Sequence, residues 1–284
     1  MDALVAGYKD HLDRCDCCGD TGWEYVFTEN GADLGRCTSC GLYFVRPLPT
    51  SNERMSHVED GTFDELAILC GKRQRQSEEI RQKEFRHYLY LVNHNASKGR
   101  WLDIGCGGGT LLALASEDGW EVEGIELNVE RAAITRQRIS GKIHTRPLEE
   151  LNIAGESFHV VSLIEVFSHL ISPKGTFQEI YRILKPGGIV ILRTSEIGTG
   201  AKRRHLFSWG LPYHVIFNGL NTLDRYAEDT SFKIVHCERE RIVNVLYSRA
   251  YFQTCGRSQF RNAVKKTVLR VPCALSLIRF LMDR

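Results

Sequence analysis

The chain has 284 residues, a formal net charge of +2 and a hydrophobic fraction of 43%. This length suits one large domain or a core with appendages, and the hydrophobic fraction is that of an ordinary globular protein. The near-neutral charge excludes a general nucleic-acid or membrane signature. The first residues do not read as a secretory signal, and the apolar stretch from Val271 to Ile278 is too short to span a bilayer. We therefore expect a soluble, cytoplasmic protein.

Two cysteine pairs near the N-terminus predict a metal site. Cys15 and Cys18 form one pair, Cys37 and Cys40 the other, 18 residues lie between the pairs, and a glycine follows each pair. This spacing is typical of a four-thiolate zinc site, which is closed and therefore structural. Cys17 makes the first pair ambiguous, but the gap between Cys15 and Cys18 matches that of the second pair. We predict a zinc ribbon over residues 1–50, with reduced thiols that bind no metal as the alternative. Packing roles rather than nucleophilic ones are expected for Cys70, Cys106, Cys237, Cys255 and Cys273.

Residues 51–97 are expected to form a helical connector or lid. They are rich in Glu, Gln, Arg and Lys, and apolar residues recur at helical spacing, as at Ile80, Phe85, Leu89 and Val92. Their charged face is expected to be solvated.

Strand and helix patterns alternate from Arg100 onward. Strands are predicted at 100–104, 121–126, 142–144, 158–163, 189–192, 232–237 and 243–250, with a turn at 185–188. Helices are predicted at 109–118, 128–139, 176–184 and 221–229, the second capped by Asn128. This alternation predicts an α/β domain over 98–252: a Rossmann-like, doubly wound, seven-stranded sheet in three layers.

The last segment, 253–284, mixes basic and apolar residues and is predicted to be a basic amphipathic helix. Such a helix can lie on an anionic membrane surface, which leaves peripheral membrane contact open. Docking on its own domain or on a second subunit is the favoured alternative.

The glycine-rich loop from Leu102 to Gly109 predicts a nucleotide site at the first strand-to-helix turn. Glu126 follows Gly105 by 21 residues and could accept hydrogen bonds from both ribose hydroxyls. A dinucleotide would place a pyrophosphate near Asp103, which would repel it. A ligand with a cationic amine and sulfonium suits this loop better, namely S-adenosylmethionine.

The pattern Asp103-x-Gly105-x-Gly107-x-Gly109 resembles motif I of class I methyltransferases. The segment from Glu156 to Thr194, with Lys-Pro-Gly-Gly inside it, is similar to the strand four to strand five section of small-molecule methyltransferases, although that family often has Asp where His159 stands. The resemblance covers about residues 100–250. It implies a cofactor site made of Asp103, Gly105, Cys106, Gly107, Gly109, Glu126, Leu127, Leu148, Ile164 and Glu165.

The ribbon, with CGLYFVRPLP at its second cysteine pair, resembles the zinc-binding appendage of bacterial methyltransferases that act on sugars or natural products. Those sugar C-methyltransferases carry a further C-terminal domain, for which this chain is too short. The resemblance is therefore to a family and not to one enzyme.

The candidate catalytic residues follow strands four and five of the predicted sheet. Glu165 and His169 would share a helix face if a helix begins there, and family members that methylate quinol precursors carry Glu and His at matching positions, with a second Glu where Ser168 stands. We expect His169 to be the general base or to orient the acceptor, with Glu165 beside the donor; local packing of His169 is the alternative.

A second candidate lies in Pro212-Tyr213-His214-Val215, which resembles a Pro-x-His-(Val/Ile) element of related enzymes. His214 or Tyr213 would contact the acceptor, unless the loop is merely exposed. The basic run 201–205 could hold a substrate phosphate, although a solvated loop is favoured.

These features predict methyl transfer to a small molecule: a sugar, a glycan or lipid-linked precursor, or a natural product. An RNA methyltransferase is one alternative, but Ser162-Leu163-Ile164-Glu165 replaces the Asn/Asp-Pro-Pro-aromatic motif, and Arg36 is the only cation between Cys15 and Cys40. A protein that binds S-adenosylmethionine without turnover is the other. The oligomeric state stays open.

Overall fold

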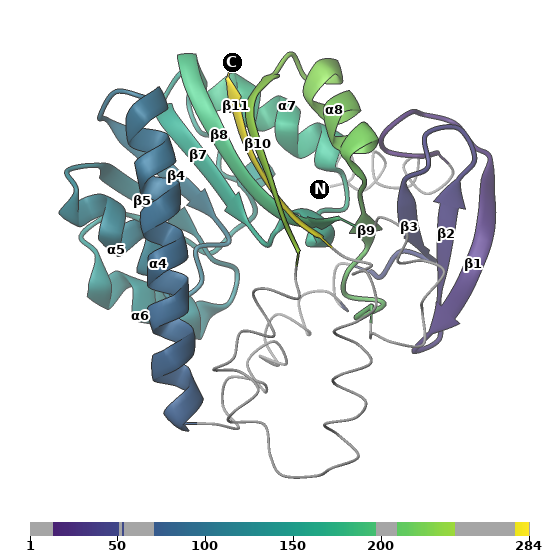
Figure 1. The fold of residues 1–284 in the computed structure, drawn as a ribbon, viewed down its shortest axis with the longest axis horizontal. Helices are drawn as coiled ribbons and strands as arrows, with labels where there is room; N and C mark the ends of the chain where they lie inside the picture. The colour runs from purple at the N-terminus through teal and green to yellow at the C-terminus, as the bar shows by residue number, and fades with distance from the viewer. Residues whose placement is uncertain (1–13, 51–52, 54–70, 197–208, 242–275, 284) are drawn as a thin grey trace.

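The computed structural model describes residues 14–50, 53, 71–196, 209–241 and 276–283 (Figure 1). Its strands are β1 (Trp23–Glu29), β2 (Ala32–Cys37), β3 (Tyr43–Arg46), β4 (Arg100–Ile104), β5 (Glu121–Ile125), β6 (Ile143–His144), β7 (Phe158–Ile164), β8 (Leu184–Glu196), β9 (Ile216–Phe217), β10 (Lys233–Arg241) and β11 (Ser276–Asp283). Its helices are α4 (Gly71–Asn95), α5 (Thr110–Glu117), α6 (Val129–Arg138), α7 (Pro173–Ile183) and α8 (Leu220–Asp229), with 3-10 turns at Leu148–Glu150 and Phe167–His169.

The main sheet has seven strands in the order β10-β11-β8-β7-β4-β5-β6. The five strands from β8 to β6 are parallel, and β11 is antiparallel to both of its neighbours. The predicted α/β, Rossmann-like fold is therefore confirmed. The carboxyl ends of the parallel strands bring the loops after β4, β5 and β7 to one edge of the sheet, where ligands bind in such folds.

Alternating side chains on each strand fill two separate cores. On β7 and β8, Val160 and Ile191 point into a core with residues of α4, α5 and α6. Their neighbours Val161 and Leu192 point into the opposite core with residues of α7 and α8. This period of two, with both faces apolar, is what a parallel sheet between two helical layers requires (Figure 1).

Local signals explain most helix starts. The Asn128 side chain accepts a hydrogen bond from Arg131 N at 2.9 Å, so the predicted cap of α6 is confirmed. Helix α7 begins earlier than predicted, because Ser172 caps it and Pro173 occupies its first turn. The segment 185–188, predicted as a turn before a strand, is instead an irregular part of β8, where the pairing with β7 shifts register.

The C-terminal segment corrects the prediction of a helix. Ser276–Asp283 forms β11 and pairs with β8 on one side and β10 on the other. This segment, with five apolar side chains among its eight residues, fits either a helix or a buried strand by periodicity alone, and here pairing on both sides decides for the strand. The predicted strand at 243–250 and the rest of the predicted helix, 253–275, lie outside the described residues.

Helix α4, within the predicted connector, packs against the α/β domain, whereas residues 51–52 and 54–70 of that connector lie outside the described residues. Tyr88 and Val92 on α4 are fully buried and pack in the core between the sheet, α5 and α6. Among the described residues, no helix is long and apolar enough to cross a membrane.

The N-terminal ribbon shares a sheet with the methyltransferase-like part of the chain. Strands β1, β2 and β3 form an antiparallel sheet whose fourth strand is β9, with Phe44 opposite Ile216. Leu34 and Val45 of the ribbon pack with Trp209 and Leu211 in a third apolar cluster. The ribbon and the loop before α8 are therefore one packed unit.

Candidate active site

The glycine loop between β4 and α5 has three residues in the left-handed region, with φ of 73° at Gly105, 54° at Gly107 and 76° at Gly109. A Cβ on Gly105 would clash with Val166, and one on Gly109 would lie 2.6 Å from Thr135 Cγ2. A Cβ on Gly107 would meet nothing within 4 Å. Two glycines are thus required by packing, while Gly107 leaves room for close approach of a ligand to the backbone.

Glu126, just after β5, holds this loop in place. One carboxylate oxygen accepts from Gly107 N at 2.9 Å and the other from Asn128 N at 2.8 Å. The side chain is buried, so these charge-assisted bonds fix its direction. Each oxygen keeps a lone pair for a further donor.

Asp103 lies under the loop rather than on its surface. Its side chain is 3% exposed and accepts a hydrogen bond from Ser162 Oγ at 2.5 Å, and Trp101 Nε1 donates to the same Ser162 Oγ at 2.8 Å. Burial raises the pKa of Asp103 to about 7, against the lowering effect of the Ser162 bond and with a further rise from the charge of Glu126. A carboxyl that titrates near neutrality beside a ligand loop can respond to a bound cation.

The remaining residues of the predicted cofactor set are apolar or weakly polar. Burial first, and then the charges of Asp103 and Glu126, raise the pKa of the Cys106 thiol, which disfavours the reactive thiolate. Leu127 and Leu148 pack in the core that faces α7 and α8, and Ile164 packs against the opposite core. Cys106 follows the end of β4, Leu127 follows the end of β5, and Ile164 is the last residue of β7.

Glu165 has a structural role that the sequence did not reveal. It has a φ of 60°, and its carboxylate pairs with Arg193 Nη1 at 2.7 Å. Arg193, 11% exposed, also lies 3.0 Å from Glu84 of α4. Although 43% of the Glu165 side chain is exposed, the protein around it raises the pKa of its carboxyl, while the Arg193 charge lowers it.

The expectation that Glu165 and His169 share a helix face is wrong. The left-handed backbone conformation of Glu165 prevents a helix from beginning there, and only a 3-10 turn at Phe167–His169 follows. Glu165 instead faces β8 and α4, and His169 faces the loop that carries His214.

His169 and His214 come together from two different loops. Their ring centroids are 4.7 Å apart. His169 Nδ1 lies 3.1 Å from the carbonyl oxygen of Tyr213, and His214 Nδ1 lies 2.9 Å from that of Trp209. A carbonyl can only accept, so in each ring Nδ1 carries the proton and, in the neutral form, Nε2 carries the lone pair.

Burial lowers the pKa of His214, and its bond to Trp209 and the charge of Glu29 act in the opposite direction. Neutral imidazole is the form that accepts a proton. Tyr213 contributes its carbonyl to His169, while its ring is 39% exposed.

Val215 joins the histidine loops to the ribbon through its backbone. Its N–H donates to Ser168 O at 2.8 Å, and its carbonyl accepts from Val45 N of β3 at 2.9 Å. These two backbone hydrogen bonds thus connect the turn that carries His169, the loop that carries His214 and the ribbon.

A cavity of about 210 Å³ lies where the ribbon meets the larger domain. Its walls are mostly apolar and include Ile171 and Ile216, each two positions along the chain from one of the paired histidines. Arg14, Arg46 and Asp16 also line it, and the Arg46 guanidinium lies over the rings of Trp23 and Phe44. The cavity therefore combines apolar surface with two cationic groups and one carboxylate, which accepts hydrogen bonds from Ser172 Oγ and Lys174 N.

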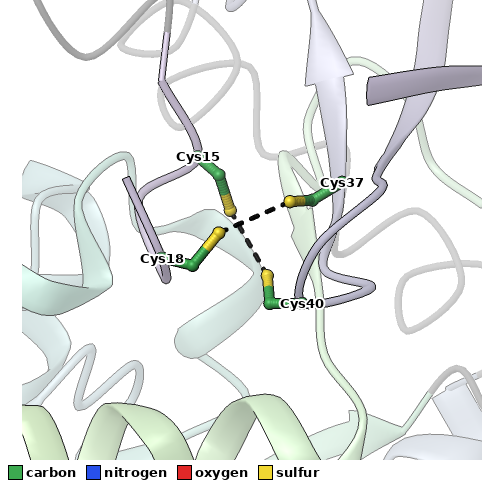
Figure 2. A group of neighbouring side chains, drawn as sticks. All are labelled: Cys15, Cys18, Cys37 and Cys40. Atoms are coloured by element: carbon green, nitrogen blue, oxygen red, sulfur yellow. Dashed lines mark hydrogen bonds between the residues drawn. The ribbon is translucent and has the colours of Figure 1, made fainter. Parts of the chain in front are cut away.

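The four predicted cysteines meet at one point. The Sγ atoms of Cys15, Cys18, Cys37 and Cys40 all lie within 4.8 Å of one another, and Figure 2 shows them pointing inward from two loops. Two of the S–S separations are 3.5 Å. Tetrahedral coordination with metal–sulfur bonds of about 2.3 Å places sulfurs about 3.8 Å apart, so the cluster fits a four-coordinate metal.

The two cysteine loops have the same local structure. Gly19 N donates to Cys15 O at 2.7 Å and Gly41 N donates to Cys37 O at 3.0 Å, with φ of 74° and 77° at the two glycines. Cys17 is not one of the four: its Sγ lies 3.9 Å from Thr222 O, and contact with Cys40 raises the pKa of its thiol. The preference for Cys15 over Cys17 as partner of Cys18 agrees with this geometry.

Several residues of the site carry no sequence signal of their own. Ser162 anchors Asp103 across neighbouring strands, Arg193 joins α4 to the loop after β7, and Glu29 bonds to Trp209 N, which is 180 residues away in the chain. Only the fold brings these partners together. The basic run 201–205 lies outside the described residues.

Known proteins share this architecture. A family model described as a methyltransferase domain matches residues 72–237. The ubiquinone biosynthesis O-methyltransferase of Pseudomonas paraeruginosa is 34% identical over 147 residues, which cover 49% of this chain and 63% of that protein. The sterol 24-C-methyltransferase of Gibberella zeae is 27% identical over 183 residues, 57% of this chain and 47% of that protein. The chain thus matches less than two thirds of the length of these relatives.

Solved structures agree on the fold. Geranyl diphosphate C-methyltransferase from Streptomyces coelicolor A3(2), crystallised with S-adenosyl-L-homocysteine, superposes with a TM-score of 0.57 at 15% sequence identity, over 71% of this chain and 79% of that one. Together with the family match over more than half of its residues, this shows that the chain belongs to the class I S-adenosylmethionine-dependent methyltransferases.

Proposed function

We propose that this protein transfers a methyl group from S-adenosylmethionine to a small-molecule acceptor. The observation that carries the proposal is the arrangement of Gly107 and Glu126: a bare backbone turn tied to a buried carboxylate at the carboxyl edge of the sheet. The Glu126 oxygens are the groups that would accept from the ribose hydroxyls. The cofactor site would comprise the ten residues named from the resemblance, with Asp103 acting from beneath the loop.

The histidine pair supports a role for the protein in removing a proton from the acceptor. When bound, the cofactor supplies an electrophilic methyl group on a sulfonium. An acceptor oxygen or carbon that attacks this methyl must lose its proton, while the carbon–sulfur electron pair stays on sulfur. His169 or His214 would take that proton at Nε2, because Nδ1 of both rings is held by a carbonyl. Tyr213 and Glu165 would then position the acceptor loop and the donor side rather than react.

The cavity where the ribbon meets the larger domain supports an acceptor with a small apolar part and an anionic group, such as a phosphorylated sugar, a lipid-linked glycan precursor or an acidic natural product. Its apolar walls and two arginines offer both kinds of contact, and the Asp16 carboxylate in its lining is already bonded to Ser172 Oγ and Lys174 N. Arg36, the cation between the cysteine pairs, is paired with Glu24, so this part of the ribbon offers little to RNA.

The cysteine cluster would hold a structural zinc ion. Four thiolates close the coordination shell, so the metal would stabilise the ribbon and leave the chemistry to other residues. Metal analysis of the purified protein should find about one zinc per chain. Replacing Cys37 with serine should abolish it, whereas replacing Cys17, which is not among the four clustered thiols, should not.

The decisive experiment offers labelled S-adenosylmethionine to extracts from cells that lack this protein. Wild type should label a small molecule, and His169→Ala and His214→Ala should label it more slowly while binding S-adenosylhomocysteine normally. If wild type binds S-adenosylhomocysteine yet labels nothing small in any extract, the proposed transfer is wrong. If both alanine variants keep the full rate, only the base role is wrong.

A further inference from the structure

The hairpin turn of the ribbon reaches into the loop that carries His214. Asn30 and Gly31, with φ of 51° and 79°, form the tight turn between β1 and β2, the Asn-Gly type that fits a two-residue hairpin. Asn30 Nδ2 donates to Leu211 O at 2.9 Å. The adjacent Glu29 accepts from Trp209 N with both carboxylate oxygens, at 3.0 and 3.1 Å. Two neighbouring ribbon residues thus hold two backbone positions of this loop.

The residue that Glu29 holds is the one that orients His214. The Trp209 N–H donates to the Glu29 carboxylate, and the Trp209 carbonyl accepts from His214 Nδ1 at 2.9 Å. The Trp209 ring is fixed as well, packed edge-on against Phe27 at 5.4 Å and Phe217 at 5.1 Å. Between Trp209 and His214 the chain makes a tight turn closed by His214 N donating to Gly210 O at 3.0 Å. A shift of the Trp209 backbone would therefore move the imidazole.

We infer that Glu29 is a positioning residue for His214: through the backbone of Trp209, the ribbon sets the orientation and the tautomer of a histidine in the acceptor site. The ribbon then completes the catalytic site in addition to supporting the fold. This inference rests on the proposed function, since it assigns a task to the same histidine. The negative charge of Glu29 also acts directly, because it favours the protonated ring against burial.

The geometry explains why a carboxylate stands at this position. Glu29 is the last residue of β1 and pairs with Ala32 of β2, so its backbone is fixed by the hairpin. Both Glu29 oxygens face the Trp209 N–H, and in a carboxylate both oxygens are acceptors. A glutamine keeps one acceptor oxygen for Trp209 N but removes the charge, whereas an alanine removes both.

The test compares Glu29→Ala and Glu29→Gln with Glu24→Gln. Glu24 lies on the same strand, is exposed and pairs with Arg36, so its variant controls for loss of a charge from the ribbon. The tautomer of His214 is read from the ring nitrogen signals of ¹⁵N-histidine-labelled protein, assigned with His214→Gln. The rate of label transfer from S-adenosylmethionine is measured in extracts of cells lacking the protein. Affinity for S-adenosylhomocysteine and thermal midpoint report on the rest of the fold.

Glu29→Ala should lose the uniform Nδ1–H signature of His214 and slow label transfer about 10- to 100-fold, the usual cost of a misplaced catalytic group, with unchanged affinity for S-adenosylhomocysteine. Glu29→Gln should fall between it and wild type, and Glu24→Gln should match wild type. If Glu29→Ala keeps the wild-type ring signals and rate, the inference is overturned. If the ring signals change but His214→Gln transfers label at the full rate, the positioning role stands and the proposed base fails.

Discussion

Replacing Glu126 with glutamine tests how the cofactor is held. In the structure both carboxylate oxygens already accept a backbone N–H, from Gly107 and from Asn128. Glutamine has one carbonyl oxygen and one NH₂ group, so one of these N–H groups would face another donor. The ribose would lose one charge-assisted acceptor, and the loop would lose one of its two fixed bonds.

The magnitude follows from these two losses. A hydrogen bond to a charged group contributes about 1.5–3 kcal/mol, and an unsatisfied buried donor costs about 1–3 kcal/mol. Part of the second cost is present without cofactor, so we expect about 3 kcal/mol less binding free energy, which corresponds to roughly 150-fold weaker binding. Glu130, exposed in the first turn of α6, provides the matched control.

Isothermal titration with S-adenosylhomocysteine measures the change directly, and circular dichroism checks that each variant is folded. Glu130→Gln should bind like wild type. A folded Glu126→Gln variant with an affinity within a factor of about three of wild type would refute the assignment of Glu126 to the ribose, because the expected loss is roughly two orders of magnitude.

Three further predictions concern the loop and the charges around it. Burial places the pKa of Asp103 at about 7, above an unfolded value of about 3.9, so the folded state binds the extra proton. The stabilising effect of this proton is full below about pH 4 and is lost as the pH rises through about 7, so cofactor-free protein should melt at a lower temperature at pH 8 than at pH 5. Asp103→Asn should flatten this dependence of the melting temperature on pH, and parallel profiles of variant and wild type would contradict the prediction. Gly109→Ala should lower the free energy of unfolding, measured by urea denaturation, by about 1–3 kcal/mol because its Cβ meets Thr135. Gly107→Ala should lower it by only about 1 kcal/mol but should weaken S-adenosylhomocysteine binding. Equal losses of stability and of binding in the two variants would argue against this difference. Arg193→Met should lower the free energy of unfolding by about 3 kcal/mol, because it leaves the carboxylates of Glu84 and Glu165 without their shared cation. Adding Glu84→Gln should recover part of this loss. Full additivity of the two substitutions in the double-mutant cycle would show that Arg193 and Glu84 are not coupled.

Features encoded in short stretches of sequence could be predicted. The glycine loop, the cysteine pairs and the Asn128 cap each depend on residues within a few positions of one another, and the alternation of apolar runs indicated the sheet. The structure brings the cysteine pairs together and forms the predicted cap as expected.

Features that depend on long-range pairing could not be predicted. The spacing of Glu165 and His169 would place both on one face if a helix began there, but no such helix forms and the partner of Glu165, Arg193, lies on β8 and also pairs with Glu84 of α4. Strand β9 has only two residues, too few for any periodicity, and it exists because β3 offers an edge. The Glu29–Trp209 contact joins residues 180 positions apart, and no pattern in the sequence near either residue indicates it.

Strand β11 has a consequence for how the protein is made. It lies between β8 and β10, and residues 242–275 separate it from β10 in the chain. Synthesis proceeds at about 5–20 residues per second from the N-terminus, so β8 and β10 leave the ribosome before the strand that joins them. In that interval the β8 edge exposes unpaired backbone groups to any passing strand. Release of a chain truncated before Ser276 would make that exposure permanent, so we expect such chains to aggregate and to depend on chaperones even though the cofactor loop is already complete.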